Sequence, residues 1–485
     1  MATKLYGVAS MLEKTTTRHE NNTDIASVVE CNGHQFAVNE CTSREIRIYP
    51  IYWPTVKNGV EVNGTFRELR MHPDDVHLGF SSFDKAGGQN CFMGRLVFNP
   101  TAHRYDLTNV NLLYDPTRSQ QITTQDGELI FHDNVIRIGE LRGFSGIGDE
   151  ILYIGPTWEA NNIDVFGVHV ITGAVRRLTQ HPEYVDPVAF SADNKWMVAM
   201  DTRGSDRQMF MSGMRHVPPI IDLVAITAAA STRNNGKRRF FQPYLIDSYG
   251  DRQGYFGQQV NGQGDGSNGA VNDANWNGRA DPAFSHDGTK TVYWQAIVAG
   301  RACGGDNPLA CPVPMTQGQR EYRLMIARLT DRKPVVVPPV FSMPDVLPWA
   351  TPFAPDSSLP HYPTLKPGPY VLHGKVSGTA DVQLIGSAKS IDAVAVNYTN
   401  FANVEGYVLN GWENVTRTIQ YPNVWNNLLD WYSDIEQTGR IHASKKTSAS
   451  GFHLQIDAMT NIFAAEGTLT TIIDGREYKQ PENGM

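Results

Sequence analysis

The 485-residue chain has the composition of an ordinary globular protein, with 41% hydrophobic, 19% charged and 10% aromatic residues, which excludes a disordered chain. Its net charge of −8 argues against nucleic-acid binding, which needs a basic face. No run of eighteen apolar residues is present, so we expect no membrane-spanning helix. The 43 glycines and 28 prolines are typical of a turn-rich all-β chain.

Four Asn-x-Ser/Thr sequons, together with cysteines that lie in close pairs, predict secretion, although the first residues lack the apolar core of a signal peptide. The expected glycosylation sites are Asn21, Asn63, Asn397 and Asn414. The expected disulfides join Cys31 to Cys41 and Cys303 to Cys311, which leaves Cys91 over. None of the five cysteines has the CxxC or zinc-ligand spacing of a metal site.

The first 60 residues contain two expected strands, at 27–30 and 45–49, which we expect to close a ring by pairing with late strands. A loose strand–turn–strand unit follows around Met71, within the irregular region 61–135. Clear copies of the same unit lie within residues 136–340. In each copy the first strand ends on a phenylalanine, at Phe144, Phe190 and Phe284.

The spacing of these phenylalanines is regular, with 46 residues between the first two and 94, or two steps of 47, between the last two. Asp287-Gly288 predicts a tight hairpin turn, and residues 291–294 are β-branched and aromatic, as in a strand. A strand-built period in the forties predicts a β-propeller, here of six or seven four-stranded blades. A β-sandwich with chance repeats is the alternative.

Several segments interrupt or follow the blades. Residues 218–230 begin with two prolines, which suits a short helix or an irregular insertion, and 260–278 predict a long loop. Eleven prolines at 334–369 indicate a linker or a strand exchange. The expected domains are a catalytic propeller at 1–345, a proline-rich linker at 346–369 and a β-sandwich-like domain at 370–485.

Aligning the repeats places an acid three or four residues before the reference Phe or Met in four copies. These acids are Glu68, Glu140, Asp186 and Asp281. In a propeller, the starts of the innermost strands share one face, so we expect the four carboxylates to meet at one channel mouth. Clustered carboxylates repel, which raises some of their pKa values and suits a general acid. Glycoside hydrolysis needs one such acid and one base or nucleophile.

The loops after the second strands reach the same face and add Glu159 as a fifth candidate catalytic acid. Arginines can hold an acidic sugar, and tryptophans can stack on a sugar or an aglycone. The candidate substrate-binding residues are Arg67, Arg142, Arg203, Arg279, Trp158, Trp276, Trp294, Gln295 and His181. Each type also has a plainer interpretation, since an Asp before Pro often caps a turn and a strand Trp usually packs in the core.

Residues 273–278 imitate the start of a calcium loop, but Phe284 stands where a Glu should close the site. His181, His216 and His286 do not share metal-ligand spacing. We therefore expect no metal and no cofactor. The absence of GxSxG, HExxH and P-loop motifs argues against serine hydrolases, zinc proteases and NTPases.

Several motifs resemble those of the fungal saponin hydrolases, the soyasaponin hydrolase group. They are Asn-Trp-Asn-Gly-Arg-Ala-Asp-Pro at 275–282, then 284–289, 211–219, 430–434 and 467–475. The propeller half also resembles TolB-like propellers, although its hairpins read Ser-Ala-Asp-Asn and Ser-His-Asp-Gly instead of Ser-Pro-Asp-Gly. The resemblance implies a secreted glycosidase that cuts the glucuronide bond between an oligosaccharide and a triterpenoid aglycone. It transfers no catalytic residue, so the site residues rest on the repeat alignment.

Two other classes of function stay open. A metal-assisted polysaccharide lyase acting on uronates would use His or Arg beside a metal. A non-catalytic carbohydrate-binding propeller would show no turnover. The sequence also leaves open which carboxylate donates the proton, whether the anomeric configuration is retained or inverted, whether a cation binds the loop at 273–281, and the oligomeric state.

Overall fold

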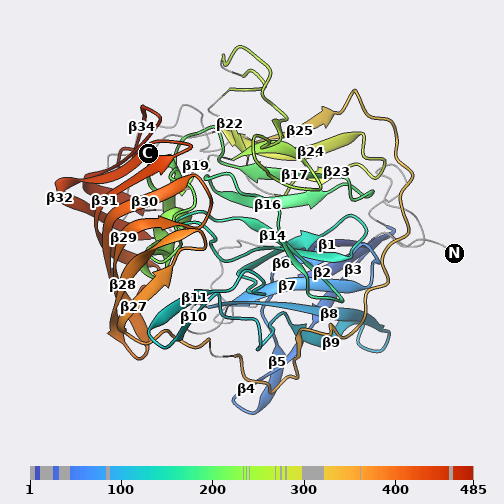
Figure 1. The fold of residues 1–485 in the computed structure, drawn as a ribbon. Helices are drawn as coiled ribbons and strands as arrows, with labels where there is room; N and C mark the ends of the chain where they lie inside the picture. Colours follow the sequence, from blue (N-terminus) through green and yellow to red (C-terminus); the bar gives the residue numbers. More distant parts are fainter. Residues whose placement is uncertain are drawn as a thin grey trace.

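A computed structural model describes residues 6–10, 26–31, 44–83, 88–232, 234–235, 238–239, 241–267, 269–273, 276–278, 281–297, 322–360, 362–457 and 462–483. The fold is all-β, as the sequence predicts, and the described ranges contain two helices. A group of blade-like sheets lies beside one large curved sheet of C-terminal strands (Figure 1). No helix within the described ranges is long and apolar enough to span a membrane.

Four sheets have the form of propeller blades. The first contains β6 (Arg67–Met71), β7 (His77–Phe83), β8 (Gln89–Asn99) and β9 (Arg104–Leu112). The second contains β12 (Glu140–Phe144), β13 (Glu150–Ile154), β14 (Val165–His169) and β15 (Val175–Arg177). The third contains β16 (Val185–Phe190), β17 (Trp196–Asp201), β20 (Gln242–Asp247) and β21 (Gln258–Gln259). The fourth contains β22 (Trp276–Gly278), β23 (Ala283–Phe284), β24 (Lys290–Ile297) and β25 (Tyr322–Arg328).

The innermost strands of these blades are neighbours, because β12 contacts both β6 and β16, and β16 contacts β23. A blade strand is covered on both faces where its blade packs between two neighbours. The sequence of β13 is accordingly a continuous apolar run, and its Ile151, Leu152 and Tyr153 are fully buried. The hairpin predicted at 287–288 joins β23 to β24, and Gly288 takes the positive φ of 70° that the turn requires.

The predicted number of six or seven blades is wrong for the described ranges, which hold four. The N-terminal strands also do not pair with late strands. Strands β1 (Tyr6–Ser10), β2 (Ala26–Cys31) and β3 (Ile46–Tyr52) extend the first blade through a parallel pairing of β3 with β9. Strands β4 (Pro54–Lys57) and β5 (Val60–Asn63) form a separate hairpin. The repeat period in the sequence comes from blades two to four. Within the described ranges, no further copy of the repeat forms a fifth blade.

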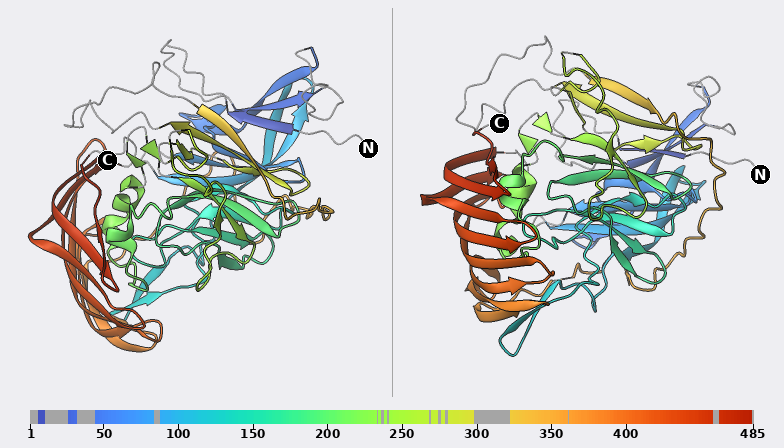
Figure 2. Two further views of the ribbon diagram at one scale, coloured as in Figure 1. Left: turned by 90° about the horizontal axis from the view of Figure 1, so that it is seen from above. Right: turned by 45° about the horizontal axis from the view of Figure 1, so that its top comes forward.

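An insertion between β17 and β20 contains α1 (Met209–Ser212), α2 (Asp222–Thr232) and the short strands β18 (Asn234–Asn235) and β19 (Arg238–Arg239). The short helix that the two prolines predicted is therefore present. Helix α2 lies between the blades and the large sheet (Figure 2) and contacts β29, β30, β32 and β33. Its Val224, Ala225 and Ala228 are fully buried there.

The residues after the proline-rich stretch form eight strands of one ten-stranded sheet, to which β10 and β11 also belong, and this corrects the predicted sandwich-like domain. The sheet contains β10 (Ile122–Gln125), β11 (Glu128–Phe131), β27 (Gly368–His373), β28 (Ser377–Ser387), β29 (Ser390–Ala402), β30 (Tyr407–Ile419), β31 (Asn426–Gly439), β32 (Ala443–Asp457), β33 (Ile462–Ile473) and β34 (Arg476–Lys479). The apolar face of this ten-stranded sheet is covered by α1, α2 and the third blade, which take the place of the second sheet of a sandwich.

The predicted linker is a strap that lies against the first two blades, together with the residues just before it. The main chain of Phe341 donates to Ile147, and that of Phe353 donates to Val110. The Trp349 indole donates to the main chain of blade two, 3.1 Å from the carbonyl oxygen of Val170. Strand β26 (Thr351–Pro352) pairs with β9. This part of the chain is therefore a docked element and not a free spacer.

Candidate functional site

The four predicted acids lie on the innermost strands or directly before them. Glu68 lies in β6, Glu140 begins β12, Asp186 lies in β16, and Asp281 precedes β23. The structure brings the first three together around one side chain, Arg142 of β12, whose guanidinium contacts Glu68 and Asp186 and lies 2.7 Å from Oε2 of Glu140. The repeat alignment thus places these carboxylates correctly with respect to one another.

Two further arginines complete the cluster, which we call the carboxylate ring. Arg67 lies 3.0 Å from Glu68 and also contacts Glu140. Arg70 bridges the first and fourth blades, at 3.3 Å from Glu68 and 3.0 Å from Asp281. Four carboxylates therefore share three guanidinium groups, and the neutralisation lets so many charges lie close together.

Glu68 is the most perturbed acid of the ring. Burial raises its pKa, the Arg142 guanidinium lowers it and the Glu140 carboxylate raises it again, to about 7. Its backbone has a positive φ of 55° at a bulge between Arg67 and Arg70, a conformation that costs a non-glycine residue about 1–3 kcal/mol. A carboxyl group with this pKa is present in both protonation states at neutral pH, as a general acid requires.

An aromatic wall adjoins the ring. The Arg67 side chain, 37% exposed, lies over the ring of Phe83 at 5.2 Å. Phe83 is 38% exposed and lies 6.3 Å from Trp425, which comes from the loop between β30 and β31 of the large sheet. Both parts of the molecule therefore contribute to this edge of the ring. Arg70, Phe83 and Trp425 were not predicted. Arg70 stands two residues after Glu68, as Arg142 does after Glu140, so the repeat could have indicated it, whereas no repeat position marks Phe83 or Trp425.

A cavity of about 630 Å³ reaches the ring from the side of the β-hairpin turns. Arg70, Arg142 and Asp281 lie at the cavity, and Pro73, Gly146, Ala192 and His286 line it from the turns of the four blades. Val337 and Val340, just before the strap, also line it. The polar ring is thus exposed to a mostly apolar space as well as to the edge that carries Phe83 and Trp425.

Glu159, the fifth predicted acid, does not join the ring. Its carboxylate lies 2.9 Å from Arg177 and 2.6 Å from Arg215, and accepts a hydrogen bond from the main chain of His216. Burial opposes its charge, but these two arginines hold its pKa well below the ordinary range. Glu159 is a buried structural anion that fixes the insertion against blade two.

Of the other predicted substrate-binding residues, those in the described ranges lie apart from the ring, in four different settings. Arg203 is buried between Asp201 and Asp251, and Trp158 lies beneath Arg177. Trp276 is stacked under Arg323, which also donates to the buried Gln295. Trp294 is half-buried and packs beside Tyr322, and Arg279 lies outside the described residues. These placements favour the packing interpretation of the tryptophans.

His181 lies beside Phe256, and burial lowers its pKa to about 3. Glu183, which lies two residues further along the chain, was not predicted as a site residue. It is almost fully buried, accepts a hydrogen bond from Ser205, and has a pKa raised by burial to about 8. The pair forms a second buried polar cluster beside the third blade, outside the ring.

Among the sequons, Asn397 and Asn414 are exposed on the large sheet, and Asn21 lies outside the described residues. The Asn63 side chain instead accepts a hydrogen bond from the main chain of Trp53. Cys91 is buried and free. The two expected disulfides fall on side chains outside the described part of the chain.

One group in the described ranges has metal-ligand character, namely His72, Asp74 and His77 in the β6–β7 turn. Their atoms already bond to protein: Asp74 accepts from His77, 2.6 Å away, and His77 also bonds to Asp345, 3.0 Å away. The His72 ring bonds to the main chain of Gly148. This network fastens the proline-rich segment to the first blade. In the calcium-like loop, Asp273 accepts from the main chain of Gly269, and residues 274–275 lie outside the described ranges.

The chain matches no family model and no curated protein. Solved structures that share its shape in part include TolB from Acinetobacter baumannii, at 12% identity and a TM-score of 0.30, covering 84% of this chain and 57% of that one. The chain thus spans little more than half the length of that TolB. Oligogalacturonate lyase from Vibrio parahaemolyticus matches at 9% identity and a TM-score of 0.21, covering 83% and 86%. Likenesses of this size carry no argument about activity.

Proposed function

We propose that the chain is a glycoside hydrolase whose catalytic groups are the carboxylates of the ring. The observation that carries the proposal is the sharing of one guanidinium, that of Arg142, by Glu68, Glu140 and Asp186. The arrangement holds one carboxyl with a pKa of about 7 beside others that pair with arginine. Two carboxyls in unlike environments are the requirement of glycosidic bond cleavage.

In this proposal Glu68 protonates the departing glycosidic oxygen. Glu140, which pairs with both Arg67 and Arg142, is the base or nucleophile, and Asp186 keeps Arg142 in place. Asp281, on the opposite side of Arg70, orients that arginine toward Glu68.

The proposed substrate class is a glucuronide of a triterpenoid, that is, a saponin, cleaved outside the cell. The resemblance to fungal saponin hydrolases supports this class, and the edge of the ring fits it chemically. The half-buried guanidinium of Arg67, which also pairs with Glu68 and Glu140, suits a uronate carboxylate, and the Phe83–Trp425 wall suits an apolar aglycone.

Product analysis on a glucuronide-linked triterpenoid saponin tests the proposal. Wild type is expected to release free aglycone, and Glu68→Gln and Glu140→Gln are expected to lose at least 100-fold in rate. Glu405→Gln, an exposed acid in a turn of the large sheet, is the matched control and keeps full activity.

Two results would contradict the proposal. One is a product with an unsaturated uronate that absorbs in the ultraviolet and disappears with chelator, which indicates a lyase. The other is binding without turnover, which indicates a carbohydrate-binding propeller.

A further inference from the structure

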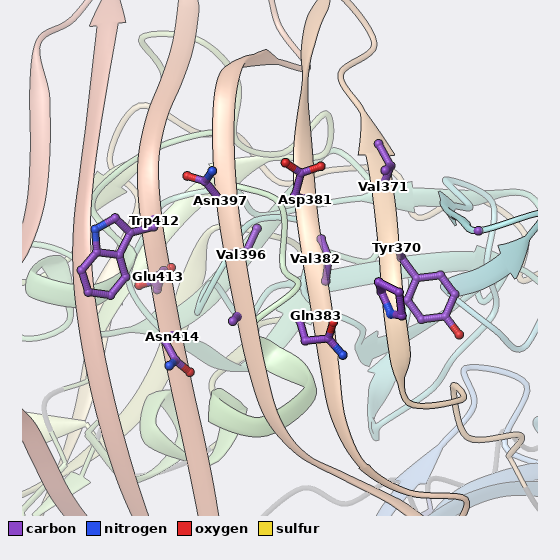
Figure 3. A pocket seen from close by; sticks show the side chains of 13 residues that line it. Tyr370, Val371, Asp381, Val382, Gln383, Val396, Asn397, Trp412, Glu413 and Asn414 are labelled. Carbon is purple, nitrogen blue, oxygen red and sulfur yellow. The ribbon is translucent and has the colours of Figure 1, made fainter.

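The outward face of the large sheet contains a trough of about 560 Å³ over β28, β29 and β30 (Figure 3). The strand register sets its side chains in two rows. Asp381, Asn397 and Trp412 are direct cross-strand partners in the first row. In the second row, Ala395 lies between Gln383 and Asn414. Cross-strand partners have Cβ atoms about 5 Å apart, so both rows act on a single ligand-sized space.

These side chains point away from the core. Along β28 and β30 the intervening residues, such as Val382 and Glu413, are buried, whereas Trp412 is 45% exposed.

The polar groups of the trough are mostly uncommitted, although the Gln383 amide donates to the main chain of Leu384 at 3.3 Å. No hydrogen bond connects the side chains of Asp381, Asn397 or Asn414 to another residue of the described ranges. Elsewhere on the same outward face, charged residues are paired, as in Asp430 with His453, at 2.6 Å, and Asp434 with Lys446, at 3.1 Å.

The chemistry of the lining selects the class of ligand. The trough has no cation, so it does not suit phosphate, sulfate or uronate groups. The sheet is continuous on both sides of these strands, so no free edge is present there to pair with a peptide. Amides that both donate and accept, beside one indole face and a small residue, suit sugar hydroxyls and the apolar face of a sugar ring. A volume of this size holds a small-molecule ligand.

We propose that this trough binds a neutral oligosaccharide, as a carbohydrate-binding surface separate from the carboxylate ring. Trp412 stacks on a sugar ring, and Asn397, Asp381, Gln383 and Asn414 bond to its hydroxyl groups. The proposal does not depend on hydrolysis, because binding is measured without turnover.

The state of the sequons provides a second test of the same surface, since Asn397 and Asn414 are both sequon residues. A glycan attached to either would fill the trough. Free sugar binding and glycosylation at these two positions exclude each other, and the mass of the natural secreted protein distinguishes them.

The experiment is titration calorimetry of the full chain with the hexasaccharides of cellulose, xylan, mannan and laminarin, and with oligogalacturonate as the anionic probe. At least one neutral hexasaccharide is expected to bind, and oligogalacturonate is not. Trp412→Ala is expected to weaken binding at least tenfold, and Asn397→Asp, which retains shape but loses a donor, severalfold. Tyr249→Ala removes an even more exposed aromatic from a blade loop and is expected to change nothing.

Glu68→Gln separates the two sites, because it leaves binding in the trough unchanged even where hydrolysis is lost. The proposal is overturned if no neutral hexasaccharide binds at millimolar concentration, if Trp412→Ala binds as wild type does, or if either of the two sequons carries a glycan.

Discussion

Glu68 combines two costs that ordinary packing residues avoid. It has a positive φ within a strand, and its half-buried carboxyl group shares Arg142 with two other acids. Strain and a raised pKa at one residue point to function more strongly than either alone, since both lower the stability of the folded chain.

The pH dependence of hydrolysis follows from the Glu68 pKa of about 7. A general acid works only when protonated, so kcat/KM is expected to fall roughly tenfold per pH unit above that value. In Glu68→Gln the alkaline fall is expected to vanish together with most of the activity. A wild-type rate that is constant from pH 6 to pH 9 would contradict the assignment.

Arg142→Met tests the shared guanidinium. Removing one partner of a buried ion pair leaves its carboxylates uncompensated, which is expected to cost about 3–5 kcal/mol in the free energy of unfolding at pH 7. Arg328→Met, on the exposed side of β25, is the control and is expected to change stability little. Urea unfolding measures both. Equal effects of the two changes would show that the ring does not depend on Arg142.

The repeat alignment found the four acids because they occupy equivalent positions on the innermost strands. It could not find Phe83 and Trp425, which meet across 342 residues of sequence. It misassigned Glu159 because the arginines that bind that acid, Arg177 and Arg215, belong to a different strand and to the insertion. The position of a residue within a repeat predicts the face of the propeller on which it lies, whereas the charge partners of that residue depend on tertiary contacts.

Among the elements, the proline-rich segment carries the clearest electrostatic contact. Asp345 bonds to His77 and to Arg95, both at 3.0 Å. Burial lowers the pKa of His77, but Asp74 and Asp345 outweigh burial and raise it above its ordinary value. The stability that His77 contributes is therefore fully present below about pH 6.5 and is lost as the pH rises through the folded pKa.

Asp345→Asn is accordingly expected to destabilise the chain more at pH 6 than at pH 9, by about 1 kcal/mol of difference. Chemical unfolding at the two pH values measures this difference. Asp356→Asn, an exposed acid further along the strap, is expected to show the same stability change at both. A pH-independent loss for Asp345→Asn would assign its whole effect to Arg95.

Element prediction from sequence succeeded for the blade hairpins and for α2, where turn residues and prolines act locally. It failed for the C-terminal sandwich. The alternation of apolar and polar residues in β28 to β33 shows that one face of the sheet is buried, but it does not show which element covers that face. Here a helix and a blade cover that face, and the pattern would be the same beneath a second sheet.

Over the whole molecule, one hydrophobic core runs from blades two and three through α1 and α2 to the large sheet. Within it, Lys445 and Glu413 form a fully buried ion pair at 2.6 Å, and Trp431 donates to the same carboxylate. The propeller and the large sheet are therefore expected to unfold together.

Lys445→Met leaves Glu413 without its cation and is expected to lower the unfolding midpoint of the whole chain, with a cost of about 3–5 kcal/mol. Circular dichroism and tryptophan fluorescence are expected to report one coincident transition in both proteins. Two separate transitions, with only one moved by the substitution, would show independent domains. Lys479→Met on the exposed edge strand β34 is the control.

The dependence of the rate on the leaving group tests the central claim, that Glu68 is the proton donor of a glycosidase, most directly. Wild type and Glu68→Gln are compared on a triterpenoid glucuronide and on a dinitrophenyl glucuronide, whose phenolate leaves without protonation. Glu68→Gln is expected to lose about 10²–10⁴-fold on the triterpenoid glucuronide and little on the dinitrophenyl one. Equal losses on both substrates, or full activity of the variant on the triterpenoid glucuronide, would contradict the account.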